Sequence, residues 1–532
     1  MKNILFLFCV FLLANLTLQS CKNEPTDDPE ATTGYAKFTQ DSLFLDWDTK
    51  SVTIKVEWGQ TVWKLAKVSG DIINSIGIEK GGSQSTDGDT SVDITVNQNT
   101  GGTIRSEYLY LTNFSTQKTV KLKLIQKTTS IGAKITLNTN VTYQKVTGFG
   151  GMLNPSWTGN NLTDADVQKL YGDMGFNIIR MMLYPNKSDW GLNTATAKKA
   201  QSLGAIVFAS PWTPPASMKS NGKTSNAEGG YLLPASYADF AAHIKAFVDY
   251  QKQQGLNIYA VSVQNEPNWK VDYDGCSWSA AQMLDFVKNY GDQVGTKLIA
   301  AEAVNNYDKT YTNALLNDAV AVNKFDIVAT HLYGSTITPD ALAAQKGKEF
   351  WMTEHCITDN DANATIPAIN WTLDASLDIL AKEIHDCMDA NMNAFVWWYL
   401  KRYYSMIADG DSRNLVASGE ISKRGYIMGH YAKYATGKTR IKNDIVTAIT
   451  LEKSLLSTAY YGNNEITVVV VNRNTMPVRI ELSSPSIVSS ATAVETTESK
   501  NMESLVPEIA NNKYSITVGM SGNSIMSVRI KI

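Results

Sequence analysis

The feature that most constrains the fold is an alternation of apolar, strand-like runs with helical stretches between residues 147 and 435. Stretches such as 237–254 and 280–294 have helical character and separate the runs. The expected strands are 177–181, 205–210, 259–263, 297–301, 327–331, 350–354 and 394–398, and residues 148–152 complete a set of eight. Eight βα units in about 290 residues predict a TIM barrel. A doubly wound parallel sheet is the alternative, but it would lack functional residues at so many strand ends.

Polar and aromatic residues follow these strands, and in a TIM barrel they gather at one mouth. They are Arg180, Trp212, Asn265, Glu266, His331, Tyr333, Glu354 and Trp398. Apart from the two glutamates, these residues are expected to bind the substrate. Cleavage of a glycosidic bond with retention needs two carboxylates about 5–5.5 Å apart, one as acid/base and one as nucleophile. Glu266 follows the fourth expected strand and Glu354 ends the seventh. Either glutamate alone would pass for a surface salt-bridge residue, but together they predict a retaining glycoside hydrolase.

Three neighbours of these glutamates have expected roles. Asn265 precedes Glu266 and is expected to hold a sugar 2-hydroxyl, a contact that strengthens in the transition state. Arg180 is expected to keep Glu354 ionised by charge attraction. Tyr333 is expected to donate a hydrogen bond to the same carboxylate.

Seven motifs in this region resemble glycoside hydrolase family 30, and most closely its bacterial glucuronoxylanase branch. They lie at 148–152, 208–215, 263–267, 331–334, 351–354, 396–399 and 421–426. The resemblance spans about residues 131–532 and implies a barrel with a side β-sandwich. It also implies retaining hydrolysis, with Glu266 as acid/base and Glu354 as nucleophile, and endo-cleavage of β-1,4-xylan directed by a 4-O-methylglucuronate branch.

In that branch an arginine after strand 8 reads the uronate, helped by neighbouring hydroxyls and by a tryptophan from the first loop. Arg402, Tyr404 and Trp157 stand at the matching positions here. A guanidinium suits bidentate recognition of a carboxylate, although an ordinary surface arginine is the alternative. Relatives carry tyrosines and then a serine after the nucleophile, whereas residues 355–360 read His-Cys-Ile-Thr-Asp-Asn. A xylanase without uronate dependence therefore stays open, as does a family-30 β-1,6-glucanase or β-glucosidase.

Other classes of protein have weaker support. The five histidines form no His-x-His or His-Glu-x-x-His motif, so neither a metal nor another cofactor is expected. A net charge of −3 does not suggest a nucleic-acid partner. A non-catalytic glycan-binding lipoprotein would keep the aromatic residues but would not need both glutamates. Cys356 is close enough to Glu354 to line the site, but a free packing thiol is the simpler interpretation.

Residues 1–20 predict a lipoprotein signal peptide. An apolar run from Ile4 to Leu18 is too short to span a bilayer comfortably, and residues 18–21 resemble a bacterial lipobox. Cys21 is therefore the expected lipidation site, with a polar linker over 21–34, and a plain secretory signal is the alternative. The expected location is the outer membrane or cell surface of a Gram-negative bacterium, with the periplasmic face as the alternative.

The barrel is flanked by segments of β character. Residues 35–127 predict an immunoglobulin-like β-sandwich that resembles a BACON domain, often found in carbohydrate-active lipoproteins. A rigid spacer is its favoured role, and glycan binding through Trp58 or Trp63 is the alternative. Residues 436–532 predict a second β-sandwich, to which residues 131–146 are expected to add a strand.

Overall fold

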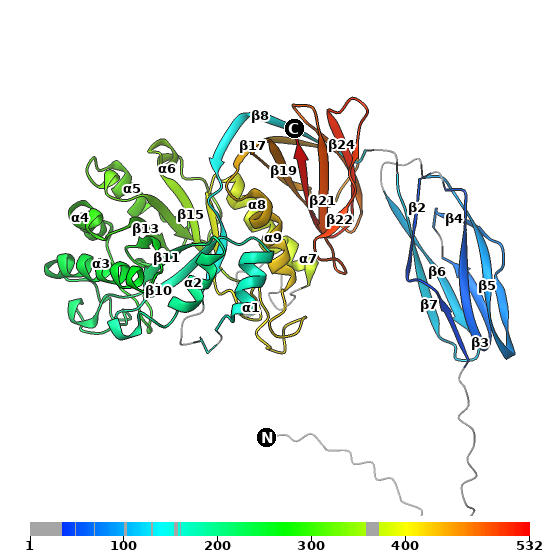
Figure 1. Cartoon of the computed structure of the whole chain (residues 1–532), viewed down its shortest axis with the longest axis horizontal. Helices are drawn as coiled ribbons and strands as arrows, with labels where there is room; N and C mark the ends of the chain where they lie inside the picture. Colours follow the sequence, from blue (N-terminus) through cyan, green and yellow to red (C-terminus); the bar gives the residue numbers. More distant parts are fainter. Residues whose placement is uncertain are drawn as a thin grey trace, which may run out of the picture. The chain divides into compact units, whose positions relative to one another are not determined.

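The computed structural model describes residues 34–532, apart from 48, 69, 100–103, 129–130, 154–157, 160 and 358–371. The predicted signal peptide, Cys21, the linker and Trp157 lie outside the described residues. The described chain forms two compact units, an N-terminal β unit and a larger unit that contains the barrel (Figure 1). Among the described helices, none has both the length and the apolar character of a membrane span.

Eight parallel strands close into a barrel in the larger unit. They are β9 (Gly148–Met152), β10 (Ile178–Leu183), β11 (Ile206–Pro211), β12 (Ile258–Ser262), β13 (Lys297–Ala303), β14 (Ile327–His331), β15 (Glu349–Glu354) and β16 (Ala394–Trp397). Closure comes from β9, which pairs with both β10 and β16. The predicted TIM barrel is therefore confirmed, and the doubly wound sheet is excluded.

Helices follow the barrel strands on the outside of the sheet (Figure 1). They are α1 (Asp164–Val167), α2 (Thr194–Ser202), α3 (Tyr237–Gln253), α4 (Ala280–Tyr290), α5 (Thr310–Asn317), α6 (Ala341–Gln345), α7 (Leu373–Ser376), α8 (Lys382–Asp389) and α9 (Lys423–Ala435). Phe240, Ile244 and Phe247 recur at helical spacing along α3 and are fully buried. A capping box of Ser279 and Gln282 starts α4.

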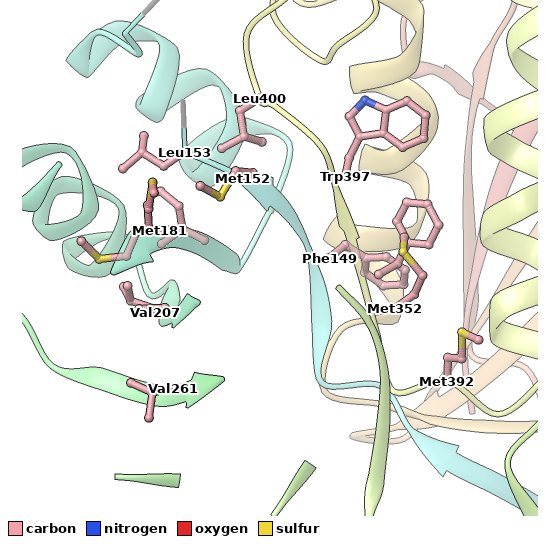
Figure 2. Packing of buried hydrophobic residues seen from close by; sticks show 14 of the residues in the cluster. Phe149, Met152, Leu153, Met181, Val207, Val261, Met352, Met392, Trp397 and Leu400 are labelled. Atoms are coloured by element: carbon pink, nitrogen blue, oxygen red, sulfur yellow. The ribbon is translucent and has the colours of Figure 1, made fainter. Parts of the chain in front are cut away.

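Side chains of the barrel strands alternate between two apolar layers. The inner layer fills the barrel with Ile178, Phe208, Ala260, Ile299, Ile327, Ala329, Trp351, Ala394 and Val396. The outer layer packs under the helices and includes Phe149, Met181, Val207 and Met352 (Figure 2). On β9 a Cβ at Gly150 would lie 1.7 Å from the carbonyl oxygen of Ile178, so β9 approaches β10 too closely there for any larger residue.

A curled ten-stranded sheet stands beside the barrel in the same unit. It contains β8 (Ala133–Lys145), β17 (Thr439–Thr447), β18 (Leu456–Gly462), β19 (Glu465–Asn472), β20 (Val478–Ser483), β21 (Ser490–Thr496), β22 (Glu503–Leu505), β23 (Glu508–Ile509), β24 (Ser515–Met520) and β25 (Ser524–Lys531). Strand β8 lies between β17 and β20, which is the strand that the sequence assigned to this sheet. The imidazole of His430 on α9 bonds Ser527 and Thr496, so the helix is fixed to the sheet.

The N-terminal unit is a seven-stranded sheet, considered by itself. Its strands are β1 (Tyr35–Phe38), β2 (Ser42–Leu45), β3 (Ser51–Lys67), β4 (Ile73–Ile76), β5 (Lys80–Val96), β6 (Arg105–Asn113) and β7 (Thr119–Gln126). Trp63 is 0% exposed, so the alternative of glycan binding through this residue is not supported. Trp58 is half-buried, and its indole donates to the hydroxyl of Thr90 at 3.1 Å.

Candidate active site

The two predicted glutamates meet at the C-terminal mouth of the barrel. Glu266 follows β12, the fourth barrel strand, and Glu354 is the last residue of β15, the seventh. One oxygen of each carboxylate and a ring nitrogen of His331 lie within 4.8 Å of one another. The side chain of Glu266 is 11% exposed and that of Glu354 is 7% exposed, so both carboxylates are largely shielded from water.

Glu354 is held by a cation and a hydroxyl. The Nη1 group of Arg180 on β10 donates to Glu354 Oε2, and the hydroxyl of Tyr333 donates to Oε1 at 2.9 Å. The guanidinium of Arg180 also lies 4.8 Å from the ring centroid of Trp212. Burial opposes the charge on Arg180, but the nearby carboxylates of Glu302 and Glu354 outweigh it and raise the pKa. Both oxygens of Glu354 are thus fixed in place by charged or polar partners.

Glu266 has a different environment. Burial raises the pKa of this carboxyl, and the contact between its Oε1 and His331 Nδ1, at 3.1 Å, offsets the rise in part. Burial also opposes the charge on His331, but Glu354, Glu266 and Glu302 outweigh it and raise the pKa of the imidazole to about 9. A carboxyl with a raised pKa retains its proton toward neutral pH, as a general acid must.

A third carboxylate, Glu302 on β13, joins the two catalytic candidates and was missed from the sequence. Its side chain is 0% exposed, and its Oε1 lies 3.1 Å from Arg180 Nη2 and 3.7 Å from His331 Nε2. Burial disfavours its charge, but Arg180 and His331 outweigh this and lower its pKa to about 2. The expected strand 297–301 stopped one residue short of it, although a glutamate at a strand end is the signal that identified Glu354.

A cleft of about 780 Å³ opens over the two glutamates. Its lining residues are Trp212, Asn265, Glu266, Trp269, Tyr273, Val304, Asn305, Tyr307, Tyr333, Gly334, Glu354, Trp398 and Tyr399. The side chains of Trp269, Tyr273 and Tyr307 are 53%, 52% and 66% exposed. These three come from the segments after β12 and β13, and no sequence pattern distinguishes them from the many other aromatic residues. Exposed aromatic faces in a cleft are suited to stacking on sugar rings.

The structure brings most of the predicted sugar-binding residues to this cleft. Trp212, Asn265, Tyr333 and Trp398 line it. The Oδ1 of Asn265 accepts a hydrogen bond from Arg180 Nη2 at 2.7 Å, which leaves the amide NH₂ to donate to a ligand. The rings of Trp212 and Trp398 lie 5.8 Å apart, centroid to centroid.

Two of the predicted sugar-binding residues have another role. The side chains of Arg180 and His331 are 0% exposed, so neither presents surface to a sugar. In this structure neither side chain is placed to contact a sugar directly. Both touch the carboxylates instead, because their positions on β10 and β14 direct them into the group formed by Glu266, Glu302 and Glu354.

Arg402 and Tyr404 lie beside the cleft and not among its lining residues. The guanidinium of Arg402 is 6.0 Å from the ring centroid of Tyr399, which does line the cleft. Its Nε is buried without a hydrogen-bond partner among the described residues. Tyr404 is 5% exposed, and burial raises the pKa of its hydroxyl. The predicted third member of this group, Trp157, is outside the described residues.

Three residues that follow or end barrel strands have a left-handed backbone. The φ angles are +48° at Glu266, +52° at Glu302 and +40° at Tyr399. Side chains other than glycine seldom adopt this conformation, and strained residues of this kind concentrate at functional sites. The strain accompanies the placement of two carboxylates and one cleft aromatic.

The cysteines and the cluster of possible metal ligands add little to this site. Cys276, Cys356 and Cys387 are free thiols and are buried. The sulfur of Cys356 lies 3.7 Å from the Tyr333 hydroxyl, which fits the packing thiol of the simpler interpretation. Glu266, His331 and Glu354 are close enough to share an ion, but Arg180 already supplies a positive charge there, which opposes binding of a cation.

A TIM barrel with two facing carboxylates and an aromatic cleft defines the site of a glycoside hydrolase. The chain is 35% identical over 357 residues to the glucuronoxylanase XynC of Bacillus subtilis, covering 64% of this chain and 78% of that protein. The solved family 30 subfamily 8 xylanase of Clostridium acetobutylicum is 33% identical, with a TM-score of 0.67 over 75% of this chain and all of that one. A family 30 endoxylanase of Clostridium papyrosolvens is 31% identical, with a TM-score of 0.62 and the same coverage.

No family model matches the sequence. The identity and coverage of these relatives are sufficient without one: the chain belongs to glycoside hydrolase family 30 and is a glycoside hydrolase.

Proposed function

We propose that the protein is a retaining endo-β-1,4-xylanase that acts on glucuronoxylan. The observation that carries the mechanism is the pair of glutamates, whose nearest oxygens lie within 4.8 Å. Retaining enzymes hold their carboxyl groups about 5–5.5 Å apart, whereas inverting enzymes need about 6.5–9.5 Å to admit a water between them. The separation in this site supports retention.

The reaction is a double displacement. In the first step an oxygen of Glu354 attacks C1 of the sugar, and the bond from C1 to the bridging oxygen breaks. Glu266 gives its proton to that oxygen, so the leaving chain departs as an alcohol. In the second step Glu266 takes a proton from water, whose oxygen attacks C1 and releases Glu354. The sugar regains its original anomeric configuration.

The surroundings of each carboxyl group support these roles. Glu354 has both oxygens oriented by Arg180 and Tyr333, as a nucleophile requires. Glu266 has the raised pKa of a group that must begin the cycle protonated. Asn265 lies beside Glu266 in the cleft with an NH₂ group available for the 2-hydroxyl.

Xylan as the substrate rests on the relatives and on the form of the cleft. The similar proteins are named glucuronoxylanase, xylanase and endoxylanase. The exposed rings of Trp269, Tyr273 and Tyr307 provide flat surfaces on which several sugar units can stack beside the acid/base. Cleavage within a chain requires sugar binding of this kind.

The proposal that the glucuronate branch determines where the xylan chain is cleaved rests on Arg402. Its guanidinium lies 6.0 Å from the ring centroid of Tyr399, which lines the cleft, and no described carboxylate forms an ion pair with it, so its charge remains available to a uronate. Arg413 nearby is already neutralised by Asp411, which accepts from its Nε and Nη2 at 2.8 Å each. This contrast supports Arg402, and not Arg413, as the residue that would read the uronate.

The product profile tests the substrate. Purified enzyme is incubated with glucuronoxylan, unsubstituted xylan, arabinoxylan and β-1,6-glucan, and the products are sized and sequenced. We expect cleavage of glucuronoxylan at a fixed distance from each uronate, and Arg402→Ala should abolish that spacing whereas Arg413→Ala preserves it. Equal cleavage of unsubstituted and uronate-bearing xylan would contradict uronate direction and leave a xylanase without it. Cleavage of β-1,6-glucan alone would contradict a xylanase.

We also propose lipid anchoring at Cys21 and an immunoglobulin-like, BACON-like fold for residues 35–127. The lipobox-like residues 18–21 support the anchor, and the apolar–polar alternation along β6 and β7 supports a sandwich. Cys21→Ser should move the enzyme from the cell-surface membrane fraction to the soluble fraction. A wild-type protein that is already soluble, or a mature N-terminus without acyl chains by mass spectrometry, would contradict the anchor.

A further inference from the structure

One outer face of the N-terminal unit combines lysines with aromatic rings. Tyr108 and Tyr110 alternate along β6 with the buried Leu109 and Leu111, so they lie on the side of the strand opposite the core. Their ring centroids are 6.3 Å apart, and both rings are partly exposed. We call this surface the lysine–tyrosine face; its members are Lys64, Lys80, Tyr108, Tyr110, Thr112, Lys121 and Lys123.

Strand pairing makes these residues one continuous surface. Lys64 on β3 pairs with Thr112 on β6 and, across the other edge, with Lys80 on β5. The ammonium of Lys121 on β7 lies 4.5 Å from the ring centroid of Tyr108. The hydroxyl of Thr112 is 2.9 Å from that of Thr119 on β7. Paired residues of neighbouring strands share a face, so these lysines lie on the same side of the sheet as the two rings.

The charge on this face is not neutralised. Within the described residues, none of its four lysines forms an ion pair with a carboxylate. Elsewhere in the same unit lysines do pair: Lys37 with Glu57 at 3.1 Å and Lys55 with Asp89 at 2.9 Å. Because no described carboxylate pairs with its lysines, the lysine–tyrosine face has a positive field open to an anion.

We propose that the lysine–tyrosine face binds an acidic polysaccharide, namely glucuronoxylan, as a binding site additional to the cleft of the barrel. Flat aromatic faces suit sugar rings, the open sheet suits an extended chain, and the ammonium groups complement uronate carboxylates. The identity of the polysaccharide rests on the proposed function. An anionic membrane is the less suitable partner, because the two partly exposed rings leave little apolar surface to insert into a bilayer.

Binding by the full chain tests this proposal. The inactive background Glu354→Gln prevents hydrolysis, and a short neutral xylo-oligosaccharide at saturation occupies the cleft. Affinity electrophoresis in glucuronoxylan then compares Lys121→Ala/Lys123→Ala with the matched pair Lys37→Ala/Lys55→Ala. We expect the first pair to weaken binding about three- to tenfold and the second to leave it unchanged, because exposed charge contacts each contribute only modestly. Tyr108→Ala/Tyr110→Ala should weaken binding as well, with native folding checked by circular dichroism.

A chemically matched ligand completes the test. Carboxyl-reduced glucuronoxylan has the same backbone without charge, and the wild-type face should bind it more weakly, to the level of the lysine variant. Equal binding of both polymers, equal loss in both lysine pairs, or a loss seen only with anionic phospholipid vesicles would overturn the proposal. Both lysine pairs, made in the active enzyme, should hydrolyse short xylo-oligosaccharides at the wild-type rate. Failure of the proposed function would instead appear as absent hydrolysis of xylan with binding to the face intact.

Discussion

The two halves of the active site contain the same residue type in opposite settings. Glu354 has a partner for each oxygen, Arg180 on one and Tyr333 on the other. Glu266 has one ring nitrogen at 3.1 Å, and burial raises its pKa. The difference supports the proposed roles: a carboxylate fixed by a cation suits attack, and a carboxyl whose pKa is raised by burial suits proton transfer.

Glu302 connects the halves. It lies beside Arg180, which holds Glu354, and beside His331, which touches Glu266. Because it is fully buried and its pKa is lowered to about 2, it provides a permanent negative charge between two cations. The contrast between the halves therefore rests on five ionisable groups from five different strands or strand ends.

The largest expected effect separates the two glutamates. Glu354→Gln should lower kcat on xylan by at least about 10⁴-fold, because no covalent intermediate forms. Glu266→Gln should lose a similar factor on xylan but retain much more activity on aryl xylosides, whose leaving groups need no proton. Steady-state kinetics on both substrates measures the contrast. Equal losses of activity in the two variants on the aryl substrate would contradict the assignment of one glutamate as acid/base and the other as nucleophile.

The next effect concerns the cation on the Glu354 side. Arg180→Lys should lower kcat about 10²- to 10³-fold, since an ammonium cannot hold Glu354, Asn265 and Glu302 together as the guanidinium does. The KM should change little, because the Arg180 side chain is 0% exposed and meets no sugar. Arg413→Lys is the matched control. A rise in KM with unchanged kcat would indicate that Arg180 binds the substrate and does not position Glu354.

A smaller effect follows from removing one hydrogen bond. Tyr333→Phe deletes the donor to Glu354 Oε1 and should lower kcat about tenfold, in the range expected for a hydrogen bond to a charged group. The ring stays in place, so the melting temperature should hold. Tyr404→Phe, which alters a buried hydroxyl outside the cleft lining, serves as a comparison. Equal losses in both variants would argue against a specific role for Tyr333.

The smallest effect is a shift of pH dependence on the Glu266 side. His331 lowers the pKa of Glu266, so replacing it with a neutral residue raises that pKa. In His331→Gln the general acid keeps its proton to higher pH, and the alkaline limb of kcat/KM should move up by about one unit. Arg180, Glu302, Tyr273, Tyr333 and Glu354 also face Glu266 and are unchanged in this variant. A downward shift would contradict the assignment of the acid.

The barrel and the two glutamates were predictable because their signals are local. Apolar runs mark each strand, and the order of strands places Glu266 and Glu354 at one mouth. Glu302 escaped because the apolar pattern ends at Ala301 and strand boundaries are the least certain part of such a prediction. The exposed aromatics Trp269 and Tyr307 lie on loops, where no periodicity separates a cleft residue from a core residue.

Trp63 shows a second feature that could not be predicted from the sequence, namely which face of a strand is buried. Buried residues of β3 fall on even positions, such as Ile54 and Val56, before a register shift between Gly59 and Thr61. After the shift they fall on odd positions, including Trp63. An irregularity of one residue exchanges the two faces of a strand, and the sequence alone does not show where it occurs.

Trapping of the glycosyl-enzyme tests directly whether Glu354 is the nucleophile. A 2-fluoro xylobiosyl donor with a dinitrophenolate leaving group should transfer its sugar to the nucleophile, where the sugar remains, because the fluorine slows both steps and the good leaving group restores the rate of the first step alone. Peptide mass spectrometry of the proteolysed enzyme should find one xylobiosyl group, on Glu354. A label on Glu266 would contradict the assignment of Glu354 as the nucleophile. Inactivation without any label, together with α-configured first products by NMR, would contradict a retaining mechanism.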